Sequence, residues 1–329
     1  FAMVILSDSA APGHEGISAS YSLTHGPRRS QCPPNYTSAR RFAPVPADLR
    51  KRTIMNDRQK YLFDLQGYLI VEDVLTDDEC ETAKEKIGER MRPMEKTPDG
   101  YDANGTWHAA GGLLAAGQPF IKLIDHPKTN DVLREIIDPQ LRLEGAYSFV
   151  RSKGCPQFEM HGGHAGGNVN FRYYVRNNKI YTGLTVISFA LQDVSAEDGG
   201  FSCIPGSHKS DFHVPAEDRK ELFRFGGPLV KSFATPKGSA VIFTETLAHG
   251  AGTWQRDDEP RYGLFYKYNA RAAIYHDQRD AIPSPETLAM MTDEQKCYFN
   301  SAWQSFGTRG SKTNTVPEHG VEPAEAAQP

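Results

Sequence analysis

The fold is decided by the run YTGLTVISFALQDV at residues 181–194. β-Branched and aromatic residues dominate this run, as they do in buried strands. Three further runs share its composition and are separated by clusters of Gly, Pro, Asn and Asp: Leu143–Val150, Ala240–Thr246 and Tyr262–Tyr268. Helical patterns come before these strands, and no regular alternation of strand and helix follows. We therefore predict a mainly β fold with flanking helices, an antiparallel sandwich or barrel.

Helix signals lie on both sides of the strands. Thr76 and Glu79 form a capping box, in which a hydroxyl and a carboxylate three residues apart cap the first turn. The apolar residues after it repeat at helical spacing: Cys80, Ala83, Ile87 and Met91. A second helix is expected over 130–137, between two proline-containing breaks. A last helix is expected from Ser284 to about residue 303.

Composition divides the chain into three parts. Residues 1–54 are rich in Ser, Ala, Pro and Arg, and we interpret them as an extension that is disordered or precedes a start at Met55, in preference to a targeting segment. Residues 55–306 have the patterns of one globular domain. Residues 307–329 are polar and are predicted to be a disordered tail.

Charge and cysteine usage exclude several classes of function. The net charge is −4, the isoelectric point is about 6.3 and no basic run occurs, so nucleic acid is not an expected partner. No apolar stretch reaches the roughly 18 residues that a membrane span needs. The five cysteines are scattered and odd in number, which favours free thiols in a reducing compartment. We expect a cytoplasmic protein.

Two histidines and an arginine form a candidate metal and anion site. His161 follows a strand-like stretch, and His249 ends another such run 88 residues later. Two histidines with a carboxylate, leaving three positions open, are the usual ligands of non-haem iron in oxygenases. Arg261 comes 12 residues after His249 at the start of a strand. Its planar guanidinium suits the bidentate binding of a carboxylate.

The stretch from residue 183 to residue 209 resembles the phytanoyl-CoA dioxygenase family. It contains Leu-Gln-Asp-Val at 191–194, Asp-Gly-Gly-Phe at 198–201 and Ile-Pro-Gly-Ser-His-Lys at 204–209. The opening segment Leu65–Ile70 also matches, as do the His-Gly pair at 249–250, Trp254 and Arg261. The resemblance covers roughly residues 57–275. Any one of these pieces alone would be a weak signal, but their combination is specific.

The resemblance implies both a fold and a reaction. The fold is a double-stranded β-helix, or jelly roll of the cupin type, with helices outside and iron inside. His161 and His249 would bind Fe(II), and Arg261 would bind the cosubstrate 2-oxoglutarate, with Lys122 as an additional cosubstrate ligand. Dioxygen would oxidise a C–H bond of a small-molecule substrate, with release of succinate and CO2. His161 is preferred to His164 as the first ligand because its distance from His249 is usual for the family.

The chain departs from the family at the third iron ligand. The usual motif is His-x-Asp or His-x-Glu, whereas this chain has His161-Gly162-Gly163, so the expected carboxylate is missing. One interpretation is that chloride fills the gap at Gly163, which resembles the iron- and 2-oxoglutarate-dependent halogenases.

In another interpretation a different acid supplies the ligand and the enzyme is a hydroxylase. The candidates are Glu159, which period two would place on the same strand face as His161, and Glu245. A third interpretation is a non-catalytic protein that binds a metal or an organic acid.

Overall fold

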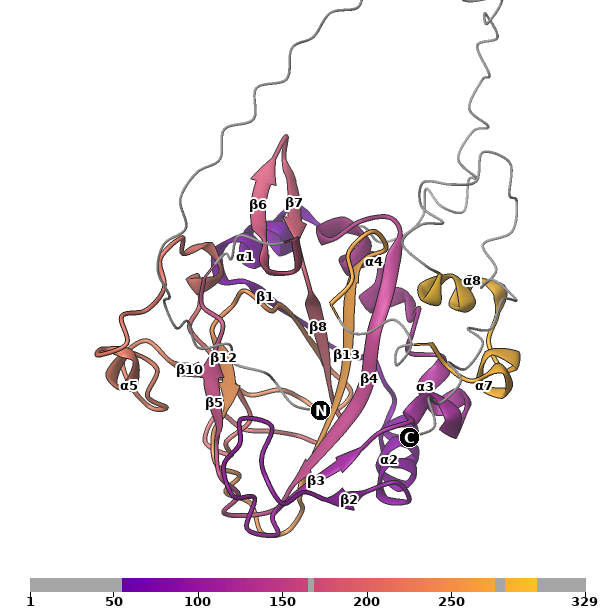
Figure 1. Cartoon of the computed structure of the whole chain (residues 1–329), viewed down its shortest axis with the longest axis horizontal. Helices are drawn as coiled ribbons and strands as arrows, with labels where there is room; N and C mark the ends of the chain where they lie inside the picture. Colours follow the sequence, from indigo (N-terminus) through magenta and orange to yellow (C-terminus); the bar gives the residue numbers. More distant parts are fainter. Residues whose placement is uncertain (1–54, 165–168, 276–281, 301–329) are drawn as a thin grey trace, which may run out of the picture. The chain divides into compact units, whose positions relative to one another are not determined.

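The computed structural model describes residues 55–164, 169–275 and 282–300. The predicted extension at 1–54 and the predicted tail at 307–329 lie outside the described residues. Two antiparallel sheets and a hairpin make up the β structure (Figure 1). The larger sheet has the order β1 (Tyr68–Val71), β11 (Ala240–Thr244), β8 (Thr185–Ala190), β13 (Arg261–Ala270), β4 (Leu141–Arg151), β3 (Trp107–Ala110) and β2 (Arg92–Pro93). The smaller sheet has the order β10 (Lys231–Ser232), β9 (Phe201–Cys203), β12 (His249–Ala251) and β5 (Phe158–His161), and the hairpin joins β6 (Tyr173–Arg176) to β7 (Lys179–Thr182).

Helices cover the outer face of the larger sheet, and the smaller sheet lies on its opposite side (Figure 1). The α-helices of the described residues are α1 (Asp57–Gln66), α2 (Asp77–Gly88), α3 (Gln118–Ile121), α4 (Pro127–Ile136), α5 (Arg219–Leu222), α7 (Pro285–Ala289) and α8 (Asp293–Lys296). No helix of this part of the chain is long and apolar enough to cross a membrane. The prediction of a mainly β fold with flanking helices is confirmed.

Alternation along the central strands builds two cores. On β8, Ile187 and Phe189 point to the helical layer, whereas Val186 points to the smaller sheet. On β13, Leu264 and Tyr266 face the helices. Because successive strand residues face opposite sides, the odd-numbered residues at the start of β13 face the smaller sheet. The space between the two sheets therefore receives side chains from both, and the candidate site lies there.

Two predicted elements differ from those observed. The run at 181–194 bends at Gly183, which separates β7 from β8, because Gly183 N–H and the next amide donate to the carbonyls of Arg172 and Asn170. A Cβ atom at Gly183 would lie 2.3 Å from the Asn170 oxygen, so only glycine fits this corner. The predicted C-terminal helix is interrupted after α7, because Thr292 caps a new helix through the backbone N–H of Gln295.

Candidate active site

The first pair of functional side chains is His161 on β5 and His249 on β12. The two residues lie opposite each other in the antiparallel pairing of these strands, and their ring centroids are 4.1 Å apart. The aromatic rings of Phe158, Phe201 and Phe243 surround them, with centroids 4.6 to 6.2 Å from a histidine ring. The β5–β12 pairing thus brings together two residues that are 88 positions apart in the sequence.

Each imidazole is held by the same kind of local hydrogen bond, to the backbone carbonyl two residues earlier. Nδ1 of His161 lies 3.0 Å from the carbonyl of Glu159, and Nδ1 of His249 lies 2.7 Å from the carbonyl of Leu247. Because a carbonyl can only accept, each Nδ1 carries the proton and each Nε2 keeps its lone pair. Hydrogen bonds of this kind fix the tautomer and ring orientation of metal-binding histidines.

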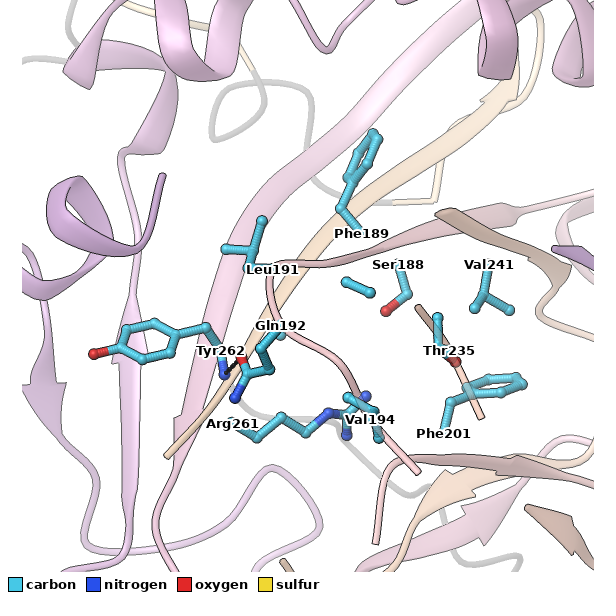
Figure 2. Close-up of a pocket in the computed structure, with 12 residues that line it drawn as sticks. Ser188, Phe189, Leu191, Gln192, Val194, Phe201, Thr235, Val241, Arg261 and Tyr262 are labelled. Carbon is cyan, nitrogen blue, oxygen red and sulfur yellow. Dashed lines mark hydrogen bonds between the residues drawn. The ribbon is translucent and has the colours of Figure 1, made fainter. Parts of the chain in front are cut away.

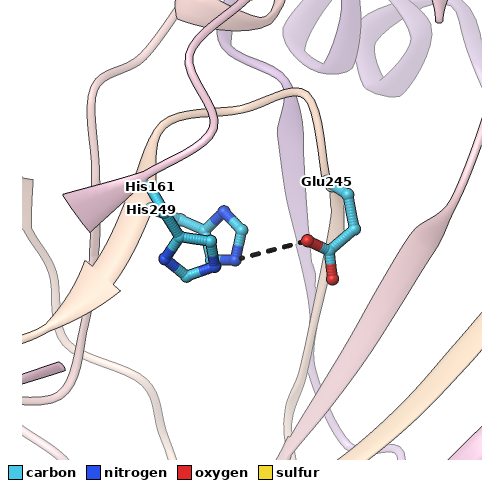
Figure 3. Close-up of side chains that lie close together, drawn as sticks. All are labelled: His161, Glu245 and His249. Atoms are coloured by element: carbon cyan, nitrogen blue, oxygen red, sulfur yellow. Dashed lines mark ion pairs between the residues drawn. The ribbon is translucent and has the colours of Figure 1, made fainter. Parts of the chain in front are cut away.

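A carboxylate completes the cluster, and it comes from Glu245 in the turn between β11 and β12 (Figure 3). Glu245 Oε2 lies 3.9 Å from His249 Nε2, and one atom from each of His161, Glu245 and His249 lies within 4.8 Å of the others. The other oxygen, Oε1, forms an ion pair of 2.5 Å with Nζ of Lys267 on β13. Glu245 is 6% exposed, so this is a buried carboxylate with a metal-ligand arrangement on one side and a cation on the other.

Burial and neighbouring charges set the protonation of these three groups. Burial, followed by the proximity of His161, lowers the pKa of His249 to about 3, and burial also lowers the pKa of His161. Burial opposes ionisation of Glu245, but the Lys267 ammonium and the two imidazoles outweigh it and lower the pKa of Glu245 to about 2. At neutral pH the cluster therefore consists of two neutral imidazoles and one carboxylate, the protonation states that bind a divalent metal.

Glu159 does not join this cluster. Between the pairs His161–His249 and Phe158–Ala251, two residues of β5 oppose one residue of β12, so the strand carries a bulge. The bulge breaks the period-two pattern and turns Glu159 outward, where its carboxylate accepts a hydrogen bond of 2.8 Å from the Tyr101 hydroxyl. The prediction that Glu159 shares the His161 face was wrong for this reason.

Gly163 occupies a crowded turn. Its φ of +91° lies in the left-handed region that favours glycine. A Cβ atom there would lie 3.0 Å from Cβ of Ala248 and 3.3 Å from the ring of Phe223. Ala248 belongs to a small apolar cluster with Met160 and Val230, and Phe223 packs against it. A side chain at position 163 would thus be directed into packed apolar atoms.

Arg261 lines a separate cavity between the sheets (Figure 2). The other lining residues include two hydroxyls and several apolar groups: Ser188, Thr235, Leu191, Val194, Phe201 and Val241. Among the described residues, no carboxylate pairs with the Arg261 guanidinium. Burial and the neighbouring Arg151 cation lower the pKa of Arg261 to about 9. Phe201 lines this cavity and also stacks 6.2 Å from His249, so the cavity adjoins the histidine pair.

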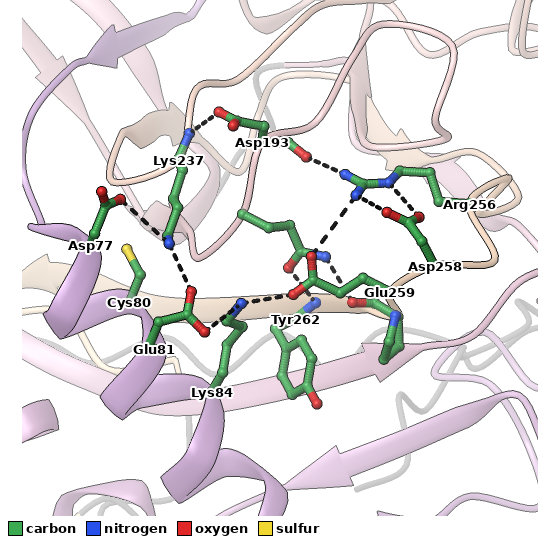
Figure 4. A network of polar contacts seen from close by, with 12 residues as sticks. Asp77, Cys80, Glu81, Lys84, Asp193, Lys237, Arg256, Asp258, Glu259 and Tyr262 are labelled. Carbon is green, nitrogen blue, oxygen red and sulfur yellow. Dashed lines mark hydrogen bonds and ion pairs between the residues drawn. The ribbon is translucent and has the colours of Figure 1, made fainter.

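Gln192 holds the backbone on both sides of Arg261. Its side-chain amide donates to the Pro260 carbonyl at 2.7 Å, and its carbonyl oxygen accepts from the Tyr262 N–H at 3.0 Å (Figure 2). The preceding segment is tied to α2 and to the loop after β8 by a network of ion pairs and hydrogen bonds (Figure 4). Its main links are Lys84 to Glu259, at 2.7 Å, and Arg256 to the Asp193 carbonyl, at 2.9 Å.

Two other predicted residues lie elsewhere. Lys122 follows α3 in the helical layer and pairs with Glu79 of α2 at 2.5 Å, so the structure does not bring it to the histidines. His164 packs against His213, with ring centroids 3.8 Å apart, and not against His249.

Lys267 was not singled out from the sequence, and Gln192 was named only as part of the Leu-Gln-Asp-Val motif. For Lys267 a signal existed, since it follows Arg261 by six residues on one strand and so lies on the same face.

Comparison with known proteins agrees with this architecture. The family model for phytanoyl-CoA dioxygenase (PhyH) matches residues 63–261. A curated relative, dioxygenase swnH2 of Arthroderma benhamiae, is 28% identical over 203 residues, which are 54% of this chain and 60% of that protein's own length.

Two solved structures show the same fold. HygX from Streptomyces hygroscopicus, solved with nickel, 2-oxoglutarate and hygromycin B, is 21% identical with a TM-score of 0.58, over 69% of this chain and 100% of that one. EctD from S. alaskensis, solved with bound iron, is 17% identical with a TM-score of 0.51, over 66% of this chain and 78% of that one. The predicted jelly-roll fold is confirmed.

Proposed function

The chain belongs to the phytanoyl-CoA dioxygenase family of Fe(II)- and 2-oxoglutarate-dependent oxygenases, and from this premise we propose that it oxidises a C–H bond of a small molecule with His161, His249 and Glu245 as its iron ligands. The observation that supports this most directly is the convergence of the three side chains within 4.8 Å. Bound iron would activate dioxygen with electrons from 2-oxoglutarate. We propose hydroxylation as the outcome at the oxidised carbon, with a small molecule as the substrate.

The residues present fit a divalent iron ion. Each histidine offers a free Nε2 with its Nδ1 already fixed by a carbonyl, and Glu245 offers the negative charge that the usual acid at position 163 would have supplied. Two imidazoles and one carboxylate are the donor set of non-haem iron oxygenases. The carboxylate would thus be retained but provided by a different segment of the chain.

Arg261 fits the far carboxylate of 2-oxoglutarate. It is a cation without a carboxylate partner among the described residues, in a cavity that adjoins His249 through Phe201. Ser188 and Thr235 add hydroxyl donors to the same cavity. A dicarboxylate between the histidine pair and Arg261 would relieve the repulsion between Arg261 and Arg151.

Halogenation is the second candidate function, because Gly163 lacks the usual carboxylate. Two features of the site favour hydroxylation instead. The direction of a side chain at position 163 is filled by Ala248 and Phe223, and Glu245 already supplies a negative charge at the histidines. A halide bound at the metal would have to compete with this carboxylate.

An anaerobic titration with Fe(II) and 2-oxoglutarate tests the proposal through the visible charge-transfer band of the complex. We expect a band that is indifferent to chloride, is lost in Glu245→Gln and is retained in Glu159→Gln, the matched control in which the acid faces outward. A band that shifts with chloride would favour the halogenase. A folded protein with no band would favour the non-catalytic binding function.

A further inference from the structure

We propose that Lys267 is a positioning residue that restricts Glu245 to metal binding through one oxygen and so keeps coordination positions open for the cosubstrate. This inference rests on the proposed function, because it concerns how Glu245 would serve as a ligand. Lys267 itself would not touch the metal or the reacting atoms.

The two oxygens of Glu245 have different neighbours. Oε1 is the oxygen paired with Lys267 Nζ at 2.5 Å, and Oε2 is the oxygen that faces His249 Nε2 at 3.9 Å. The pair is well shielded, since the side chain of Lys267 is 18% exposed and that of Glu245 is 7% exposed. In such surroundings a charge-assisted contact is strong, and leaving either partner alone is costly.

The fold fixes Lys267 in this place. A bulge between Lys267 and the next residue shifts the register of β13 against β4, and bulges re-aim side chains. The residue opposite Lys267 on β4 is Gly145, which has no side chain to compete for the space. The phenol of Tyr147 lies beside the ammonium on the same face.

The consequence for a bound metal concerns the number of open positions. A free carboxylate can bind a metal through one oxygen or two. Two histidines and a two-oxygen carboxylate would occupy four of six positions, leaving no room for both the two-point chelation by a 2-oxo acid and dioxygen. With Oε1 engaged by Lys267, Glu245 would offer Oε2 alone, and three positions would remain, as in the usual facial arrangement.

The test uses Co(II) and 2-oxoglutarate as probes, without turnover, on the full chain. Lys267→Arg keeps the charge but replaces a point charge by a fork that can engage both carboxylate oxygens. We expect this variant to bind Co(II) about 10- to 100-fold more weakly than the parent protein, the usual effect of altering the partner of a metal ligand. Lys267→Met frees Oε1 to bind the metal as well, so we expect this variant to retain Co(II) but to lose 2-oxoglutarate affinity.

Lys60→Met is the matched control, because Lys60 of α1 also pairs with a glutamate, Glu135 of α4, at 2.7 Å but lies in the helical layer outside the site. It should leave both affinities unchanged. Parental Co(II) affinity in Lys267→Arg would show that only the charge matters and would overturn the inference, even if Lys267→Met failed to fold. Parental 2-oxoglutarate affinity in Co(II)-loaded Lys267→Met would also overturn it. If the parent protein bound Co(II) no better than Glu245→Gln, the proposed function itself would fail, and Lys267 would lose its role with it.

Discussion

Replacing Arg261 by methionine should stabilise the protein without ligands and weaken its binding of 2-oxoglutarate. Arg261 is a cation without a carboxylate partner among the described residues, and burial and the adjacent Arg151 lower its pKa to about 9. A pKa of about 9 in place of 12.5 corresponds to roughly 5 kcal/mol of unfavourable free energy for the charged form. Because the side chain is partly exposed, solvent screening reduces this to about 2 kcal/mol.

The Arg261 guanidinium, which is destabilising without a ligand, should contribute favourably to the free energy of binding a dicarboxylate. Two charge-assisted hydrogen bonds contribute about 1.5–3 kcal/mol each. We therefore expect Arg261→Met to lower 2-oxoglutarate affinity by at least about 100-fold. The opposite signs of the two effects separate a binding residue from a structural one.

Urea unfolding of the metal-free protein and calorimetric titration of the Ni(II)-loaded protein with 2-oxoglutarate measure the two effects. Arg92→Met is the matched control, since Arg92 is an exposed arginine on β2, the edge strand of the larger sheet. This control should lose a little stability and keep its affinity. An Arg261→Met protein that is less stable than the parent, or one that binds 2-oxoglutarate equally well, would refute the reasoning.

Four further outcomes are expected. Gly163→Asp should lower the unfolding free energy by about 1–3 kcal/mol, because it forces a side chain against Ala248 at positive φ. Gly111→Asp is the control, because a side chain there meets open space and should change the unfolding free energy little. Urea denaturation compares the two variants. Burial lowers the pKa of His208 to about 4, so protonation of His208 should contribute about 3 kcal/mol to the fall in unfolding free energy as the pH drops from 6.5 towards 4. This contribution should be missing in His208→Gln when the parent and the variant are unfolded across that pH range. Gln192→Leu should raise the KM for 2-oxoglutarate in a succinate-formation assay while leaving kcat near the parental value, because it releases the backbone beside Arg261. Lys122→Ala should leave 2-oxoglutarate affinity unchanged in a calorimetric titration, and a loss there would place Lys122 in the site after all.

The strands could be predicted from the sequence because their signals are local, and the histidine pair could be predicted because its spacing matches a family pattern. Runs of β-branched residues marked β4, β8, β11 and β13, and the spacing of His161, His249 and Arg261 matched a known family pattern. Capping residues likewise located α2. The strand and capping signals depend on neighbours in the sequence, so a single chain reveals them.

The third carboxylate could not be chosen from the sequence because its choice depends on tertiary pairing. A regular strand would have placed Glu159 beside His161, but the bulge opposite β12 turned it outward. Glu245 reaches the histidines only because the turn after β11 brings it there, and Lys267 meets it from another strand. Irregular register and long-range ion pairs of this kind leave no periodic signal.

The distribution of donors between strands bears on how firmly the metal would be held while the protein fluctuates. Glu245 and His249 are four residues apart on one continuous segment, whereas His161 is the single donor from β5. In the usual His-x-Asp arrangement the balance is reversed, with two donors on the first segment. A bound ion would therefore act as a cross-link between β5 and β12, and opening of β5 alone would remove one donor and leave a two-donor remnant on the β12 side. Amide exchange in β5 should slow on metal binding more than exchange in β12.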